Sequence, residues 1–197
     1  MKKLFLVLAL LFNSYWGICQ MGTRHSVKAG VSYVLFGTGD MVGFNYYNEY
    51  NQSLNPYVTF APSLHVGYGS RDEGYARFTK ASISLDPNFF VSPMWFDRSK
   101  IRLGIGPSLR YTSSSLPTSH GYSLVGPIPE HPTDQATYAI DLNYTRPMNY
   151  WAVGYTVVLE GEVTLDRGWS TGIRASFQNY TSGGTVANIG LNVGYQF

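Results

Sequence analysis

The sequence predicts an all-β fold, a transmembrane antiparallel up-and-down β-barrel with eight strands. Apolar residues alternate with small or polar residues along eight stretches of the chain, and this period of two places each set on its own face of a strand. The chain is 16% aromatic but only 13% charged, whereas average soluble domains are about 25% charged. Its mean hydropathy is −0.10, as expected when lipid-facing and interior positions alternate.

The N-terminal segment, residues 1–20, is typical of a secretory signal peptide. Lys2 and Lys3 precede an apolar run over residues 4–12, followed by smaller residues. This run is too short for a membrane-spanning helix. The predicted barrel domain is therefore residues 21–197, and cleavage is expected near Cys19 or Gln20.

The charge and cysteine content restrict the function further. Without the two N-terminal lysines, the basic residues fall from 14 to 12, equal to the 12 acidic residues. The mature net charge is then 0, and nothing suggests a nucleic-acid partner.

Cys19 is the single cysteine, so no intramolecular disulfide forms. An acylated Cys19 is the alternative, but Ile18 stands where a lipoprotein signal has a small residue.

The eight alternating stretches are separated by turn signals. The predicted strands are 26–36, 42–51, 57–68, 75–91, 101–112, 149–165, 169–180 and 185–197. Breaks near 52–56, 92–99 and 166–168 then share one end of the barrel, and breaks at 37–41, 69–74, 113–148 and 181–184 share the other. Pro62 argues against its strand, because proline cannot donate to a ladder.

The long segment 113–148 loses the alternating pattern and contains five prolines. It is predicted to be a long loop at one end of the barrel, although 136–145 alternates well enough to extend as a strand. A second topology treats 42–51 as a loop and 136–145 as a barrel strand. It ranks second because it requires a proline-rich connection of about twenty residues at the end with short turns.

The final stretch, TVANIGLNVGYQF, carries a family resemblance. Ala187, Ile189, Leu191, Val193, Tyr195 and Phe197 share one parity, and small or polar residues share the other. An amphipathic last strand that ends on Phe, with Tyr two residues earlier, resembles the C-terminal signature of Gram-negative outer-membrane β-barrels. The resemblance covers residues 26–197 and is to small barrels such as the transmembrane part of outer membrane protein A. It implies an outer-membrane location among lipid, and assembly by the barrel-assembly machinery, which reads this strand.

The charged residues within the strands predict a polar network inside the barrel. They share the parity of the small residues: Lys28, Glu49, His65, Lys80, Asp86, Arg102, Arg110, Glu160, Glu162 and Arg174. Leaving His65 neutral, five are basic and four acidic, so we expect nearly complete ion pairing. Because eight strands enclose an interior that side chains just fill, this network is expected to act as a structural plug. A soluble β-sandwich or lipocalin-like barrel is the alternative, but its outward face would carry charges.

Aromatic residues near the strand ends predict the two membrane interfaces. The candidates are Trp151 at the outer end and Trp169, Tyr195 and Phe197 at the periplasmic end. Phe89, Tyr111 and Tyr75 are further candidates.

Catalytic and cofactor signals are weak. Some small outer-membrane barrels modify lipid A with His and Ser, and this chain has His120 beside Ser119 and Ser123, and His131 near Glu130 and Asp134. Their spacing matches no motif. No metal-ligand spacing and no phosphate-binding glycine loop occurs, so no cofactor is expected.

The sequence thus predicts a structural or interaction protein without enzymatic activity. The loop 113–148 is its candidate recognition element for a protein or a glycan. A channel for small or hydrophobic solutes remains an alternative, although a charged interior argues against a hydrophobic ligand.

Overall fold

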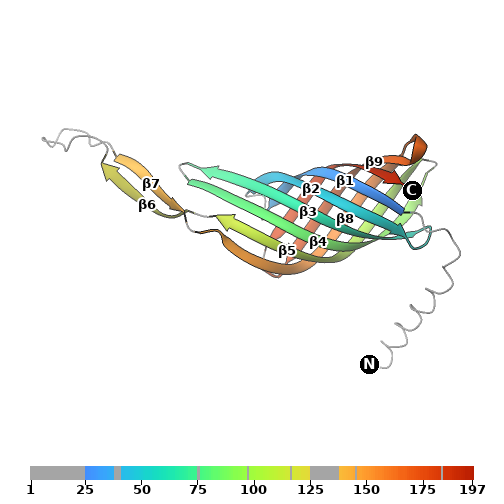
Figure 1. The fold of residues 1–197 in the computed structure, drawn as a ribbon, viewed down its shortest axis with the longest axis horizontal. Coiled ribbons are helices and arrows are strands. Elements are labelled where there is room, and N and C mark those ends of the chain that lie inside the picture. The colour runs from blue at the N-terminus through green and yellow to red at the C-terminus, as the bar shows by residue number, and fades with distance from the viewer. Residues whose placement is uncertain are drawn as a thin grey trace, which may run out of the picture.

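The computed structural model describes residues 25–37, 41–74, 76–96, 98–115, 117–124, 138–144, 146–182 and 184–197. Eight antiparallel strands close into a barrel in the order β1-β10-β9-β8-β5-β4-β3-β2 (Figure 1). They are β1 His25–Phe36, β2 Met41–Ser53, β3 Val58–Glu73, β4 Ala76–Trp95, β5 Ser99–Ser115, β8 Met148–Thr164, β9 Trp169–Tyr180 and β10 Thr185–Gln196. A short 3₁₀ turn, η1 Asp166–Gly168, joins β8 to β9. The predicted fold class is confirmed.

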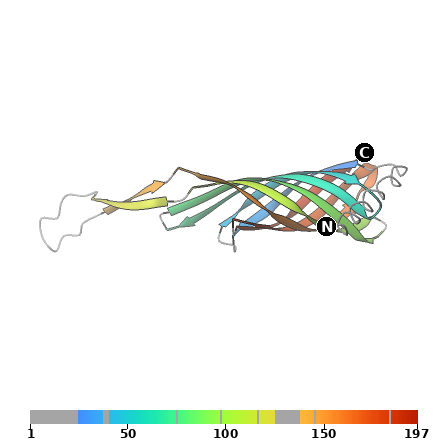
Figure 2. The same cartoon turned by 90° about the horizontal axis from the view of Figure 1, so that it is seen from below.

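The segment between β5 and β8 forms a hairpin of its own. β6 (Pro117–Leu124) and β7 (Tyr138–Tyr144) pair antiparallel in a separate two-stranded sheet. Figures 1 and 2 show this hairpin standing beyond the barrel, in line with β5 and β8. Residues 42–51 lie in β2 of the barrel, so the second topology is wrong. The strand extension predicted within 136–145 is confirmed as β7, but the prediction missed β6.

The turns divide between two ends of the barrel. We call the end that holds His25 and Phe197 the terminal end, and the end from which β6 and β7 project the hairpin end. β1 closes the barrel against β10, with pairs from Phe36–Val186 at the hairpin end to Ser26–Gln196 at the terminal end. The Phe197 amide then donates to the His25 carbonyl at 2.9 Å. The last strand therefore forms the seam that removes the open edges of the sheet.

The distribution of side chains is inverted relative to a soluble protein. Leu, Ile, Val and aromatic residues cover the outside of the barrel; Ile105, Ile173 and Leu191 are each 61% exposed. Polar and charged side chains fill the inside, where Arg102 and Glu160 are at most 2% exposed. A barrel pairs its backbone groups internally, so this apolar exterior suits a lipid environment. Among the described residues, no helix is long and apolar enough to cross a membrane.

Two small apolar clusters interrupt the polar interior. Val34, Phe36, Ala152, Tyr180 and Val186 pack together near the hairpin end. Ala61, Phe90 and Val158 pack together nearer the terminal end. Tyr180 of the first cluster also joins the polar network, because its hydroxyl lies 2.8 Å from Ser108 Oγ.

Two of the prolines within strands occupy facing positions. Pro62 in β3 lies opposite Pro87 in β4, and both have outward parity. The β3–β4 register runs unbroken through this pair. The donor that Pro62 lacks instead interrupts the pairing of β3 with β2, which has no partners between Glu49–Ser63 and Gln52–Phe60. Strand β3 therefore continues through Pro62, with a local interruption of its pairing with β2.

Candidate functional site

All ten residues of the predicted polar network point into the barrel: nine are buried and Lys80 is half-buried. They form three regions along the interior. The first, at the terminal end, is centred on Glu160 of β8. Its Oε1 lies 2.5 Å from Lys28 Nζ, and its Oε2 lies 3.2 Å from Arg102 Nη2. Lys28 also pairs with Glu162. Glu160 and Glu162, which are alternate residues of β8, thus both bind Lys28 of β1. In the barrel order β1 is three positions away from β8.

Arg102 and Arg174 link this cluster across the barrel. Arg102 Nη2 lies 3.0 Å from Glu49 Oε1, and its Nη1 donates to Asn51 Oδ1 at 2.8 Å. Arg174 of β9 pairs with the other oxygen of Glu49. Aromatic rings support both guanidinium groups, with Arg102 4.2 Å from the Phe90 centroid and Arg174 4.6 Å from the Tyr47 centroid. Buried charges are tolerated only when they are paired and hydrogen-bonded in this way.

The second region, in the middle of the interior, surrounds Asp86. Its carboxylate accepts hydrogen bonds from Ser108 Oγ at 2.5 Å and Gln178 Nε2 at 2.6 Å. His65 Nε2 lies 3.4 Å from Asp86 Oδ2 and 3.1 Å from Ser63 Oγ. Neutral donors and one histidine therefore hold this carboxylate, and no arginine or lysine of the described chain lies within ion-pair distance of it.

The middle region contains Ser, His and Asp, but not in a catalytic arrangement. Ser63 and Asp86 both contact Nε2 of His65, whereas a nucleophile and its orienting acid must use opposite ring nitrogens. The amide nitrogen of Asn45 lies 3.2 Å from Nδ1, which makes Nδ1 the acceptor and Nε2 the donor. A donating Nε2 cannot take a proton from Ser63, so this cluster is an interior hydrogen-bond network.

The third region, towards the hairpin end, contains Arg110 and Lys80. Among the described residues, no carboxylate lies within ion-pair distance of either cation. Each instead lies over an aromatic ring, with Arg110 3.8 Å from the Tyr180 centroid and Lys80 Nζ 5.5 Å from the Phe36 centroid. The expectation of nearly complete ion pairing is therefore wrong for this region. The acids are concentrated towards the terminal end and the middle, which counting charges along the sequence does not reveal.

The interior leaves little free space. The space between Ser32, Tyr47, His65 and Arg174 is too small to admit a water molecule. At the terminal end, a small polar hollow of about 40 Å³ reaches Arg102 and Glu162. Solvent thus enters the terminal mouth but meets the ion-pair cluster, which blocks a continuous path.

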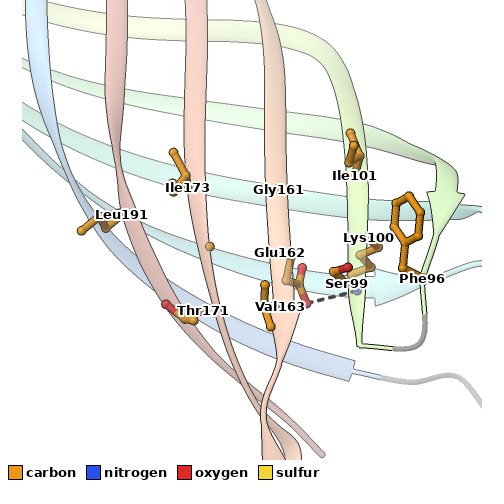
Figure 3. Close-up of a pocket in the computed structure, with 11 residues that line it drawn as sticks. Phe96, Ser99, Lys100, Ile101, Gly161, Glu162, Val163, Thr171, Ile173 and Leu191 are labelled. Atoms are coloured by element: carbon orange, nitrogen blue, oxygen red, sulfur yellow. Dashed lines mark ion pairs between the residues drawn. The ribbon is translucent and has the colours of Figure 1, made fainter.

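A hollow lies on the outer wall, near the terminal end (Figure 3). Gly161 of β8 faces outward between Ile101 of β5 and Ile173 of β9, with which it pairs. A Cβ added at Gly161 would meet no atom within 4 Å. The Lys100–Glu162 ion pair, 3.1 Å long, borders this hollow. This hollow is shallow and mostly apolar, so acyl chains of surrounding lipid can pack in it.

The predicted interfacial aromatics face outward. Trp169 and Tyr195 pack together at the terminal end with ring centroids 5.3 Å apart, and Phe197 is 65% exposed. Trp151 packs on Tyr111 with centroids 5.1 Å apart. The side chain of Tyr75 lies outside the described residues. Outward aromatics near both ends are the arrangement that a membrane interface requires.

The sequence prediction missed several members of the interior network. Lys100 pairs with Glu162 but was assigned to a turn, because the predicted strand began at residue 101. Had the predicted strand been extended by two residues, Lys100 would have shared the inward face with Arg102. Asn51, Gln178 and Ser108 carry no charge, so only the inward parity of their strands could have marked them.

The catalytic candidates of the hairpin region stay untested. His120 falls in β6, but its side chain is outside those that the structure describes, and His131 lies in the undescribed part. Within the described ranges, no group of three or more His, Cys, Asp or Glu side chains is arranged to hold a metal ion.

Comparison with known proteins finds similarity in fold. No protein-family model and no curated protein sequence matches the chain. Neisserial surface protein A matches with a TM-score of 0.56 at 12% identity, covering 89% of this chain and 97% of that chain. The attachment invasion locus protein Ail of Yersinia pestis matches with a TM-score of 0.53 at 10% identity, covering 90% and 100%. A major outer membrane protein of Thermus thermophilus matches with a TM-score of 0.50 at 12% identity, covering 89% and 100%.

At such low identity these matches establish the fold alone. Together with the closed antiparallel barrel of eight strands, they show that the chain has the fold of the small outer-membrane β-barrel proteins.

Proposed function

We propose that this protein is an integral outer-membrane barrel that serves recognition at the cell surface, with the β6–β7 hairpin as the recognition element. In this orientation the terminal end faces the periplasm and the hairpin end faces outward. The fold and the apolar exterior support the location. The projecting hairpin is the single observation that carries the recognition role.

The hairpin offers main-chain groups for a partner. In the described part of the chain, β6 and β7 pair only with each other, so each has an unpaired edge. An extended segment of a partner protein can add to such an edge through main-chain hydrogen bonds. At its base, the Arg77 amide of β4 donates to the Tyr144 hydroxyl at 3.1 Å, which ties the hairpin to the barrel.

Charge distinguishes between classes of partner. Another structure of Ail is in complex with the heparin analogue sucrose octasulfate (TM-score 0.53, 11% identity, covering 90% of this chain and all of that chain). Residues 113–148 here contain three acidic residues, Glu130, Asp134 and Asp141, but one basic residue, Arg146. Such a segment repels a sulfated polysaccharide, so a protein strand is the favoured partner and a glycan the second.

Cell fractionation tests the location. We expect the protein in the outer-membrane fraction, as a compact band on a cold detergent gel that shifts on boiling. Release as a soluble protein without a shift would refute the barrel in the membrane.

Hairpin trimming tests the recognition role. Cells displaying the wild type are scored on an array of purified extracellular proteins and glycans, beside cells displaying a variant in which a short Gly-Asn turn replaces residues 117–144. We expect binding to be lost in the trimmed variant, which should keep its gel shift, and to persist in Ser182→Ala, which alters a neighbouring outer turn. Unchanged binding after trimming, or no binding by the wild type, would refute this role.

The enzymatic alternative has a separate test. It requires a change in lipid A mass on expression of the wild type, lost in His120→Ala or His131→Ala. We expect no change in mass.

A further inference from the structure

Arg110 is a buried cation without a hydrogen-bond acceptor in the described part of the chain. Its side chain is 1% exposed, and neither Nε, Nη1 nor Nη2 has a hydrogen-bond partner. The Tyr180 ring, 3.8 Å away, attracts the positive charge. A ring face offers little to the five N–H groups, which lie in the guanidinium plane. Burying such a group without acceptors is costly, so an acceptor from outside the chain would be bound favourably.

Two further unused donors lie on the same side of the interior. Thr112, two residues nearer the hairpin end of β5, is 0% exposed, and its hydroxyl has no partner among the described residues. Lys80 of the adjacent strand β4 pairs in register with Ser114 of β5, so it lies nearer still to the outer mouth. Among the described residues, Lys80 has only the Phe36 ring as a contact for its charge.

Asp86 of β4, an interior acid, forms no ion pair with Arg110 or Lys80. Asp86 is held by Ser108 and Gln178 in the middle region, at 2.5 and 2.6 Å. At the terminal end, in contrast, Glu49, Glu160 and Glu162 form ion pairs with their cations, although Arg102 Nε and Arg174 Nε and Nη2 have no hydrogen-bond partner. The outer half of the interior, as far as the structure describes it, therefore has an excess of positive charge and of hydrogen-bond donors.

The guanidinium group is directed towards the outer turn between β9 and β10. A Cβ built on Gly184, in that turn, would lie 2.8 Å from Arg110 Nη2. The Arg110 side chain thus reaches across the interior from β5 to a half-buried glycine at the hairpin end. A side chain at residue 184 would obstruct the end of Arg110, and glycine leaves this approach open.

We propose that the outer half of the barrel binds a tetrahedral oxyanion, a phosphate or sulfate group, through Arg110, with Thr112 and Lys80 as additional donors. Arginine binds such groups through two parallel N–H···O bonds, and a hydroxyl and an ammonium add donors from other directions. The anion enters from the outer mouth, past the turn at Gly184. It is either a free ion or an ester group carried by a surface saccharide.

Phosphate-dependent stabilisation tests this site. The folded protein in detergent is heated in sodium phosphate or in sodium chloride of equal ionic strength, and the temperature of its gel shift is measured. A ligand that binds only the folded state raises this temperature. We expect a rise for the wild type and none for Arg110→Met. Calorimetric titration should show at least about a tenfold loss of phosphate affinity, the effect of losing one charge-assisted interaction. Lys80→Gln should weaken binding less.

Arg98→Gln is the matched control, because Arg98 is an exposed arginine at the opposite end, 3.6 Å from Asp166. It should keep the full phosphate effect. A purely structural role for Arg110 would instead make Arg110→Met less stable by the same amount in both salts. An equal loss of stability in both salts would overturn the proposal. So would the absence of a phosphate effect on the wild type, or equal phosphate effects in Arg110→Met and Arg98→Gln.

A comparison of two probes identifies the source of the anion. Stabilisation by inorganic phosphate alone indicates a site for a free ion. Stabilisation by glucose 1-phosphate as well indicates that the mouth admits an ester on a saccharide. Both results depend on Arg110 if the site is as proposed.

Discussion

Glu160 is the residue on which the terminal-end cluster depends, because its carboxylate lies within 2.5 to 3.8 Å of Lys28, Arg102 and Arg174. Glu160→Gln would leave these buried cations short of one negative charge. Removing one partner of a buried ion pair costs about 3–5 kcal/mol. We expect a loss of this size in the free energy of unfolding, measured by urea titration in detergent with tryptophan fluorescence.

The exposed pair Arg71–Glu73 provides the comparison, since its side chains are 42% and 50% exposed. Glu73→Gln should change the free energy of unfolding by no more than about 1 kcal/mol. Equal losses in Glu73→Gln and Glu160→Gln would contradict the central role of Glu160.

Two glycines on opposite faces of the barrel wall should respond in opposite ways to alanine. At Gly104, inside the barrel, an added Cβ would lie 2.6 Å from the Phe90 ring, which supports Arg102. We expect Gly104→Ala to destabilise the protein by about 1–3 kcal/mol through overpacking. At Gly161 the space is open, so Gly161→Ala should be neutral or stabilise by up to about 1 kcal/mol, because alanine loses less backbone entropy. The same urea titration checks both, and a reversed order would contradict the assignment of faces.

Among the elements, β10 combines the seam of the barrel with the predicted assembly signal. The backbone of Phe197 is bonded to that of His25, and its ring is 65% exposed and stacks only on the His25 ring, with centroids 6.1 Å apart, among the described aromatic contacts. Phe197→Ala should therefore leave folding in detergent unchanged but reduce the amount of protein in the outer membrane of cells. Phe96→Ala, which also removes an exposed aromatic from the terminal end, should reduce neither. Slower folding of Phe197→Ala in detergent would show a packing role instead of a signal.

Periodicity predicted the barrel strands because alternation between lipid and interior constrains every residue of a spanning strand. Beyond the barrel it predicted β7 but missed β6. β6 includes Pro117 and Gly121, and in the hairpin neither face must meet lipid, so no strict alternation marks it. The beginning of β5 was placed two residues late for a similar reason, since Ser99 and Lys100 lie at the rim.

The inward parity also predicted which charges enter the interior, but not their pairing. Pairing depends on height along the barrel, and height depends on the register between strands that are distant in the sequence. Lys28 meets Glu160 from a strand 132 residues away. Arg110 pairs in register with Ser84 of the neighbouring strand β4. It forms no ion pair with an acid in the described part of the chain. A count of charges could not reveal that the outer half of the interior is left positive.

At the scale of the whole molecule, the apolar exterior and the polar interior assign different roles to the two surfaces. The exterior needs only to be apolar to suit lipid. The interior requires specific pairs, such as Arg102 with Glu49 and Arg174 with Glu49, which join strands that are not neighbours in the sheet. The interior network therefore fixes the closed shape of the barrel, while the exterior fixes its environment.

This closed interior argues against the channel alternative. Arg102, Arg174 and Glu160 occupy the cross-section near the terminal end at 3% exposure or less, and the gap beside Tyr47 does not admit water. We expect the purified protein to give no stepwise conductance in planar bilayers and no uptake of small sugars in liposome swelling. A variant with the plug weakened, Arg102→Ser with Glu49→Ser, removes one positive and one negative charge together and is the positive comparison. Discrete conductance steps from the wild type would show that the ion-pair network lines a pore instead of closing it.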